Sequence, residues 1–359
     1  MYFPRFVISN QILKNVGIID ACREVIVSAP IVPAWEKQFA AEATLRTVHY
    51  GTAIEGNQLS YEQAREVLEG KEVVARDRDI REILNYRDVM VYLEALGEAY
   101  GAINNGEMFV YTEEIVKKIQ SLTVQGLIDE GVGEYRDVSV VVRSVRSGVQ
   151  AFVAPKPAQV PFLMEAFIRW LNDEKSREVH SVLRAGVTHY VMAAIHPFVE
   201  GNGRTARAMA MLVMMAEGYD IKKLFSLEEH FDREVMTYYD VLGEVTSQSV
   251  NLEDRDLTVW LEYFTRVLAI ELTLIRDKVR NLSLDIKLKN KVGKQIALSE
   301  RQIALVTYLK DHEAMTMREA REVLSYVSDD TLLRDLRDLI DKRLVKKKGS
   351  TKAAKYVLV

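Results

Sequence analysis

The segment from His196 to Arg207 combines, within twelve residues, a candidate base, a carboxylate and two arginines. Imidazole titrates near neutral pH, so His196 is suited to accept the proton of an attacking hydroxyl. Glu200 can hold a hard divalent cation, which would screen phosphate charge from its own carboxylate. The residue types therefore favour chemistry at a phosphate group.

A Gly201-Asn202-Gly203 turn lies within this segment and feeds an apolar run of helical character, Ala208 to Met215. The N–H groups at the start of a helix point at one place, and the helix dipole adds positive potential there. Arg204 and Arg207 stand three residues apart, so both can reach one polyanion. The pattern predicts a site for nucleotide phosphates with a base beside it.

The whole run His196-Pro197-Phe198-Val199-Glu200-Gly201-Asn202-Gly203-Arg204-Thr205-Ala206-Arg207 matches every specified position of the Fic motif, H-P-F-x-[D/E]-G-N-G-R-x-x-R. The chain thus resembles Fic-domain proteins. This resemblance implies transfer of AMP from ATP to a hydroxyl side chain of a protein.

The resemblance also implies a role for each motif residue. His196 would be the general base, and Glu200 would bind Mg²⁺ that bridges the α- and β-phosphates. Gly201, Asn202 and Gly203 would form the anion hole for the α-phosphate. Arg204 would grip the β-phosphate and Arg207 the γ-phosphate.

A second signature is Gly51-Thr52-Ala53-Ile54-Glu55-Gly56-Asn57. It resembles the family's inhibitory motif, [S/T]-x-x-x-E-[G/N], whose glutamate pairs with the second arginine of the Fic motif. Here Glu55 would pair with Arg207 and deny it to the γ-phosphate. Gly51 departs from the family's Ser or Thr, and Thr52 carries the nearest hydroxyl. An N-terminal surface motif without this function is the alternative.

A short β-hairpin is predicted from two β-branched runs, residues 138–143 and 150–153, separated by Ser147-Gly148. In Fic proteins a hairpin in this position is the flap that aligns the target segment as an added strand. Val140, Val141, Val142 and Phe152 are the candidate docking residues. The alternative is a plain edge hairpin that stabilises the domain.

Two aromatic positions, Tyr238 and Tyr239, resemble the family's helix beside the nucleotide base and are candidates for lining the adenine pocket. Core packing is the alternative for both.

His189 precedes His196 by seven residues on about the same helical face. Since no carboxylate shares a ligand-like spacing, a core or capping histidine is favoured over a metal ligand there.

The fold class expected is mainly α: a Fic-type helical bundle with a β-hairpin flap and a C-terminal winged helix-turn-helix domain. Helices are predicted at 34–54, 60–69, 79–100, 112–125, 159–172, 179–195, 203–217, 232–242 and 256–279, and in the C-terminal domain at 299–310, 317–324 and 329–343. The domains expected are residues 1–90, an N-terminal region with the inhibitory helix, 91–280, the catalytic core, and 292–359, the winged helix.

The helix in the recognition position, residues 329–343, has five Asp against four Lys and Arg. Because phosphate contacts dominate DNA affinity, this composition favours a protein-interaction or packing role over DNA binding. Lysines in the two-stranded wing that follows offer some compensation. DNA therefore stays a possible but disfavoured partner.

Composition indicates an ordinary soluble protein with a net charge of −4 and a single cysteine, Cys22. Internal disulfides and multi-cysteine zinc sites are excluded, and a cytoplasmic location without membrane spans is expected. The leading hypothesis is an autoinhibited protein adenylyltransferase that uses ATP and Mg²⁺ and acts on a protein target or on itself. Removal of AMP at the same site, and a winged-helix regulator with a nucleotide-sensing Fic domain, are the alternatives. A homo-oligomer stays open.

Overall fold

The computed structural model describes residues 2–29, 33–103, 108–143, 150–219, 221, 224–292, 298–312, 314–349 and 354–358. The chain divides into two compact units, one made of Met1–Val27 and Val32–Arg276 and the other of Ser28–Ile31 and Asp277–Val359. Most described residues are helical, which confirms the mainly α prediction.

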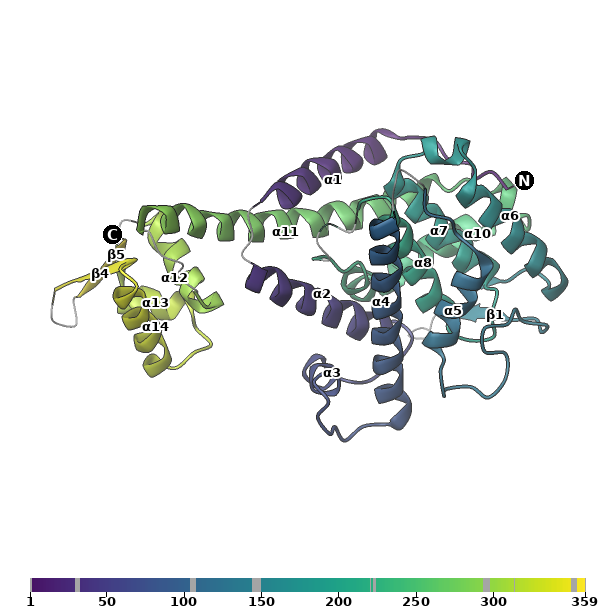
Figure 1. The fold of residues 1–359 in the computed structure, drawn as a ribbon. Coiled ribbons are helices and arrows are strands. Elements are labelled where there is room, and N and C mark those ends of the chain that lie inside the picture. Colours follow the sequence, from purple (N-terminus) through teal and green to yellow (C-terminus); the bar gives the residue numbers. More distant parts are fainter. Residues whose placement is uncertain are drawn as a thin grey trace. The chain divides into compact units, whose positions relative to one another are not determined.

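The first unit is built from helices and one hairpin (Figure 1). The helices are α1 (Asn10–Ser28), α2 (Pro33–Ala53), α3 (Tyr61–Leu68), α4 (Asp77–Ile103), α5 (Glu113–Thr123), α6 (Val160–Asn172), α7 (Ser181–Ile195), α8 (Asn202–Ala216), α9 (Glu228–Arg233), α10 (Val235–Ser247) and α11 (Thr258–Val292), which continues into the second unit from Asp277 on. Strand β1 (Val141–Arg143) pairs antiparallel with β2 (Gln150–Val153). Helix α4 runs across residue 90, where a domain boundary was expected, and α11 extends thirteen residues past its predicted end at 279.

Helix α7 forms the centre of this unit, since every residue from Val182 to Ile195 is buried. It packs along α8, and the two lie side by side in the middle of the unit (Figure 1). On α7, Gly186 allows close approach of α11: a Cβ there would lie 2.7 Å from Leu261, and Trp260 donates to the Gly186 carbonyl at 2.7 Å. Burial on all sides fixes both ends of α7, including the end that carries His196.

Helix α1 was not predicted, because apolar side chains lie on its exposed face as well as along its buried stripe. Ile12 and Ile19 are fully buried, whereas Leu13 is 64% exposed. Its place is set instead by tertiary contacts, such as the bond from Asn15 Nδ2 to Thr265 Oγ1 of α11 at 3.0 Å. Helix α9 was also not predicted as a separate element.

The second unit contains α12 (Glu300–Asp311), β3 (Met315–Thr316), α13 (Met317–Val323), α14 (Asp329–Asp341), β4 (Val345–Lys348) and β5 (Lys355–Leu358). The three predicted helices and two C-terminal strands are present, and β3 adds a third strand in the order β3-β5-β4. These elements enclose a hydrophobic core of their own, formed around Leu305, Met315, Leu332, Leu336 and Leu339.

Side chains at the N-termini of α12 and α13 fix where these helices begin. Ser299 and Thr316 each accept a hydrogen bond from the backbone three residues on, and Gln302 and Glu319 return one. Across the described residues, none of the helices combines the length and the apolar character that a membrane span requires.

Candidate active site

His196 caps the end of α7 in a left-handed conformation, with φ 51° and ψ 60°. Its ring nitrogen Nδ1 lies 3.3 Å from the Ala193 carbonyl, which can only accept a hydrogen, so Nδ1 is the protonated nitrogen. Burial lowers the pKa of His196 to about 4, although the Ala193 carbonyl and Glu55 act in the opposite direction. The imidazole is therefore neutral at pH 7 with Nε2 as its basic atom.

The loop between α7 and α8 is held by Asn202. Its side-chain oxygen accepts from the Phe198 N–H at 2.9 Å and its Nδ2 donates to the Phe198 carbonyl at 2.8 Å. Phe198 is fully buried beneath. Asn202 thus closes the loop with its side chain, and only its backbone N–H stays available to a phosphate.

Helix α8 begins after Gly201, which adopts φ +81° and provides no side-chain cap. A Cβ at this position would lie 2.8 Å from Val124, so only glycine fits both the turn and the packing. Thr205 N–H bonds the Gly201 carbonyl at 2.9 Å and begins the helical ladder. The N–H groups before it have no partner within the helix and point at the predicted anion hole.

Arg204 and Arg207 are both buried, 2% and 3% exposed, on the first two turns of α8. The Arg204 guanidinium lies 3.9 Å from Glu82 and 3.8 Å from Glu200. Among the described residues, Nε and Nη1 of both arginines have no hydrogen-bond partner. Buried guanidinium donors normally find acceptors, and N–H groups of this kind suit an anionic ligand.

The predicted pair of Glu55 and Arg207 is present. Arg207 Nη2 donates to Glu55 Oε1 at 2.9 Å and also to the Gly51 carbonyl at 2.8 Å. Burial raises the pKa of the Glu55 carboxyl, but the charges of Arg207 and Arg204 outweigh it, and the pKa lies below its usual value. Glu55 is therefore an anion beside the buried arginines of α8.

The Glu55 carboxylate also lies against the backbone of α8. A Cβ added to Gly203 would come within 2.1 Å of Glu55 Oε1, a distance no real contact allows. Gly203 thus leaves room for an acidic group directly beside the helix N-terminus. Glu55 fills that room here, and a phosphate fits the same chemistry.

The glycine at position 51, where the family has Ser or Thr, is explained by its neighbours in this chain. A Cβ there would lie 2.5 Å from Cε1 of Tyr86, so the ring of α4 occupies the place of the family's Ser or Thr side chain. The neighbouring Thr52 hydroxyl donates back to the Val48 and His49 carbonyls, both at 2.9 Å, and does not replace it. Tyr86 in turn bonds Glu228, a fully buried carboxyl whose pKa burial raises.

Glu200, the expected metal ligand, is 27% exposed in its side chain and pairs with Arg78 of α4. Its backbone carbonyl accepts from Gln120 at 3.1 Å, which fixes the residue beside α8. The described residues contain no cluster of three His, Cys, Asp or Glu able to hold a metal. A single carboxylate fits Mg²⁺ only when phosphates supply further oxygens, which is how proteins commonly hold this ion.

Arg136 was not predicted, yet it joins the base of the hairpin to the catalytic loop. Its guanidinium donates to the carbonyls of His196 at 2.7 Å, Val138 at 2.8 Å and Pro155 at 2.6 Å. Its own N–H bonds the Pro197 carbonyl at 2.9 Å. One buried side chain therefore holds the hairpin and the backbone of the candidate base together.

The hairpin is shorter than predicted, with Val141 opposite Val153 and Val142 opposite Phe152. Val141 is 45% exposed and Val140 half-buried. The side chains of Val142 and Phe152 lie outside the described part of the chain.

The tyrosines of α10 differ in their surroundings. Tyr238 is 2% exposed, and its hydroxyl bonds His189 Nε2 at 3.1 Å. His189 stacks on Trp260 with ring centroids 4.8 Å apart, and burial lowers its pKa to about 3. His189 is thus a core histidine, and Tyr238 packs in the same aromatic cluster. Tyr239 is half-buried, whereas Tyr238 is buried.

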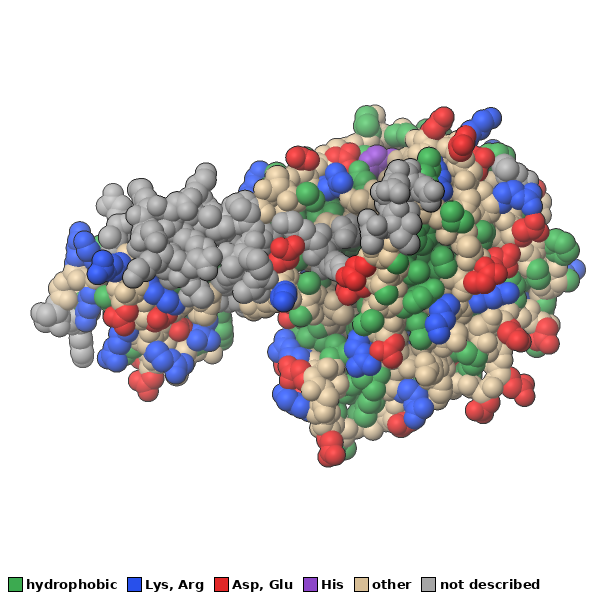
Figure 2. Space-filling model, viewed as in Figure 1, with side chains coloured by type: hydrophobic (Ala, Val, Ile, Leu, Met, Phe, Trp, Pro, Cys, Tyr) green, Lys and Arg blue, Asp and Glu red, His purple; other side chains and the backbone are tan. Residues whose placement is uncertain are grey.

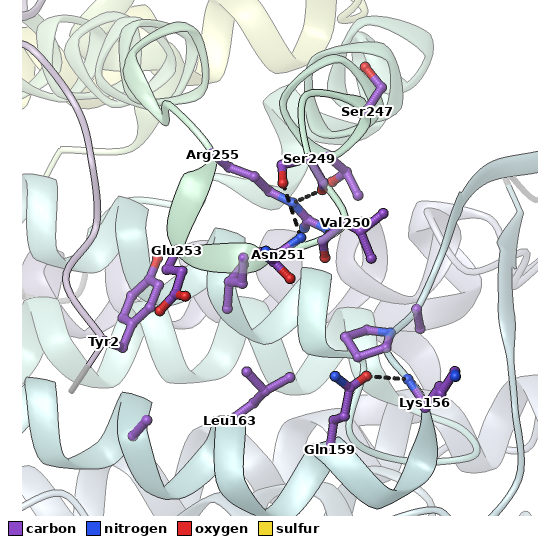
Figure 3. Close-up of a pocket in the computed structure, with 15 residues that line it drawn as sticks. Tyr2, Lys156, Gln159, Leu163, Ser247, Ser249, Val250, Asn251, Glu253 and Arg255 are labelled. Atoms are coloured by element: carbon purple, nitrogen blue, oxygen red, sulfur yellow. Dashed lines mark hydrogen bonds between the residues drawn. The ribbon is translucent and has the colours of Figure 1, made fainter.

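A cavity of about 890 Å³ opens beside the hairpin base, lined by Pro155, Gln159, Ser249, Val250 and Arg255 among others (Figure 3). Arg255 bonds the Ser249 carbonyl at 2.8 Å and the Val250 carbonyl at 3.3 Å at its wall. None of the predicted site residues lines it. The phosphate chemistry therefore does not coincide with this cavity.

Known proteins resemble this chain in sequence. The sequence model of the Fic/DOC family matches residues 110–214. "Protein adenylyltransferase Fic" of Culex quinquefasciatus is 29% identical over 231 residues, 64% of this chain and 42% of that protein. Its namesake from Drosophila grimshawi is 33% identical over 184 residues, 50% and 34% of the two chains. The chain thus spans about two fifths or less of these curated relatives.

Solved structures show the same fold. A Fic family protein from Desulfovibrio desulfuricans G20 superimposes with a TM-score of 0.63 at 23% identity, covering 100% of this chain and 98% of that one. Fic-1 from C. elegans gives 0.57 at 21% identity, covering 77% and 74%. The stretch that carries His196 and both arginines lies inside the match to the Fic/DOC family model.

Proposed function

We propose that this chain transfers AMP from ATP to a hydroxyl side chain of a protein and that Glu55 holds the activity in check. One observation carries the transfer proposal: a neutral His196 stands beside a helix N-terminus whose two buried arginines have unused donors among the described residues. The relatives in Culex and Drosophila that are named protein adenylyltransferase support the same reaction.

In the proposed reaction the target hydroxyl oxygen forms a bond to the α-phosphorus while the bond from that phosphorus to the β-phosphate oxygen breaks. The hydroxyl proton passes to Nε2 of His196, and pyrophosphate leaves. The Ala193 carbonyl keeps the proton on Nδ1 and so keeps Nε2 basic. Arg136 fixes the His196 backbone, which sets where the base stands.

The N-terminus of α8 holds the α-phosphate through the N–H groups of Asn202 and Gly203, where charge develops during transfer. Arg204 and Arg207 hold the β- and γ-phosphates with their free guanidinium edges. Glu200, once released by Arg78, would hold Mg²⁺, and that ion would neutralise charge on the leaving pyrophosphate.

Glu55 is the proposed lock. Its carboxylate accepts a hydrogen bond from Arg207 and lies against Gly203. A bound triphosphate would therefore find this Arg207 donor already used and would be repelled by the negative charge of Glu55. An exposed strand β1 offers main-chain pairing to a target segment, with Val141 pointing to solvent. Adenine would lie near Tyr239 of α10.

Two labelled forms of ATP test the reaction class. Label at the α-phosphate should enter protein and label at the γ-phosphate should not, because AMP is the transferred group. His196→Ala should abolish transfer while calorimetry still detects ATP binding, and His312→Ala, an exposed histidine of the second unit, should leave transfer unchanged. Entry of the γ-label would replace the proposal with phosphoryl transfer.

Removal of AMP uses the same residues, with Glu55 aligning a water on the α-phosphorus. The position of Glu55 beside Gly203 is compatible with that reaction. Incubating AMP-modified protein without ATP separates the two directions. Release of AMP that requires Glu55 would assign the reverse reaction.

A further inference from the structure

The two units of the chain carry opposite charge. Residues 277–359 contain 19 Lys and Arg against 12 Asp and Glu, a net charge of +7, although the whole chain carries −4. Residues 1–276 therefore carry −11. In Figure 2 basic side chains are spread over the surface of the C-terminal unit, with fewer acidic ones between them. The second unit is a basic module attached to an acidic one.

The net charge of +7 already counts the acids of α14, and three of these acids pair with bases of the same unit. Asp335 is 5% exposed and pairs with Arg301 at 2.6 Å. Asp329 pairs with Arg321 at 2.5 Å, and Asp338 with Lys342. A count of charges along the helix therefore overstates the repulsion that it presents to a polyanion.

The solvent face of α14 carries one stripe of exposed side chains, Asp330, Arg334, Arg337 and Asp341, and Asp329 is exposed beside it. These positions fall within an arc of about 60° around the helix, whereas Asp329 and Asp338 lie roughly 90° to either side. Arg334 and Arg337 stand within this stripe, and neither has an ion-pair partner in the described part of the unit.

Strand β4 extends the basic surface. Val345 is buried, and Lys346, Lys347 and Lys348 after it are all exposed. The strand stands at the edge of the β3-β5-β4 sheet and contacts α14, so these lysines and the helix belong to the same compact unit. Lys355 adds an exposed base on the neighbouring strand β5.

The composition of this surface favours a phosphate backbone over a protein partner. Protein interfaces have an apolar or aromatic centre and are poor in lysine. The exposed positions of α14 and β4 consist of Lys, Arg and Asp, without an apolar side chain. The exposed Tyr326, 74% accessible in the turn before α14, adds a hydroxyl donor of the kind that contacts phosphates.

We propose that the unit formed by residues 277–359 binds duplex DNA. Helix α14 spans about 20 Å and has the width that the major groove admits. Arg334 and Arg337 contact the groove, and the lysines of β4 contact phosphates beside it. This role is separate from AMP transfer and does not depend on it.

The test uses the full chain and a fluorescently labelled random-sequence duplex of about 30 base pairs, followed by anisotropy across a salt series. Binding should weaken steeply with salt. Replacing Lys346, Lys347 and Lys348 by Gln should reduce the log–log salt slope by about one for each phosphate that these lysines neutralise. Arg334→Gln with Arg337→Gln should weaken binding at least tenfold. All five side chains are exposed, so folding is preserved, which thermal unfolding checks.

A matched control replaces three exposed lysines of the first unit, Lys14, Lys37 and Lys175, by Gln. This variant should bind DNA as the parent does. Three results would overturn the proposal: no binding of the duplex at about 50 mM salt, the same fall in affinity in the control as in the β4 variant, or binding of labelled polyglutamate with an affinity equal to that of the duplex. Unchanged AMP transfer in every variant keeps this test distinct from the proposed reaction.

Discussion

Glu55 accepts a hydrogen bond from Arg207 at 2.9 Å across 152 residues of chain, and the same Arg207 nitrogen also bonds the Gly51 carbonyl. One guanidinium nitrogen thus donates hydrogen bonds to both a side chain and the backbone of a single helical turn at the end of α2. The Nε and Nη1 atoms of Arg207 meanwhile have no hydrogen-bond partner in the described residues. Both hydrogen bonds from this guanidinium to the end of α2 therefore come from Nη2.

Replacing Glu55 by Gly should raise transfer of α-labelled AMP to the protein itself at least tenfold. The change removes a carboxylate from Arg207 and from the surface of Gly203, so both become available to phosphates. Scintillation counting of precipitated protein measures the gain. Glu69→Gly, at an exposed position after α3, should change nothing, and Glu55→Gly combined with His196→Ala should be inactive. A rate equal to the parent's would remove Glu55 as the lock.

Replacing Gly51 by Ser should lower the free energy of unfolding by about 1–3 kcal/mol, because a Cβ has no room beside Tyr86. Adding Tyr86→Leu should recover part of that stability by opening space. Urea unfolding measures both effects. Gly97→Ser is the matched control, since a Cβ in that helix meets only Met215 at an ordinary 3.5 Å. Equal destabilisation at the two glycines would contradict a specific role for Tyr86.

The catalytic segment was predictable because its parts are contiguous: the base, the turn and both arginines lie within twelve residues. Glu55 was predictable from its own short signature, and its partner is the one expected. Arg136, Tyr86 and Glu228 were not predictable, since each acts through contacts with residues 60 or more positions away. Local sequence patterns do not indicate contacts between residues so far apart in the chain.

In the fold, too, features set by local sequence were predictable and those set by long-range contacts were not. Helices whose ends are set by local capping, such as α12 and α13, were predicted to within two residues. Helix α1 was missed because exposed apolar side chains such as Leu13 obscure the helical spacing of its buried residues, Ile12, Asn15, Ile19, Cys22 and Ile26. The number of charged residues on α14 was correct. The pairing of Asp335 with Arg301, however, depends on how α12 packs against α14 and could not be predicted from the helix alone.

The rate of transfer should be insensitive to pH from about 8 down to 5 and should fall only near pH 4. Burial lowers the pKa of His196 to about 4, so the neutral, basic imidazole persists at pH values where an ordinary histidine is protonated. kcat/KM of the Glu55→Gly form, measured across pH, reports this value for the free enzyme. Glu55 raises the pKa of His196, so its removal moves the acid limb no higher. An acid limb at pH 6.5 would mean that His196 is not buried as described.

Arg136→Gln should reduce turnover ten- to a hundredfold while ATP affinity changes less than threefold. The substitution leaves carbonyls of His196, Val138 and Pro155 without their donor, so the base and the hairpin shift relative to each other. The phosphate site on α8 stays in place, because it is built from the helix N-terminus and the two arginines of that helix. Calorimetry gives the ATP affinity, and labelled transfer gives the turnover.

The matched control for Arg136 is Arg169→Gln, an exposed arginine of α6 whose side chain is 56% accessible. It should keep full turnover. Arg136→Lys retains the charge but offers one donor group in place of a planar fork, so it should restore only part of the turnover. If Lys restored full turnover, charge alone would explain the effect of Arg136 on His196. If ATP affinity and turnover fell together, Arg136 would be a residue of general stability rather than one that positions the base against the hairpin.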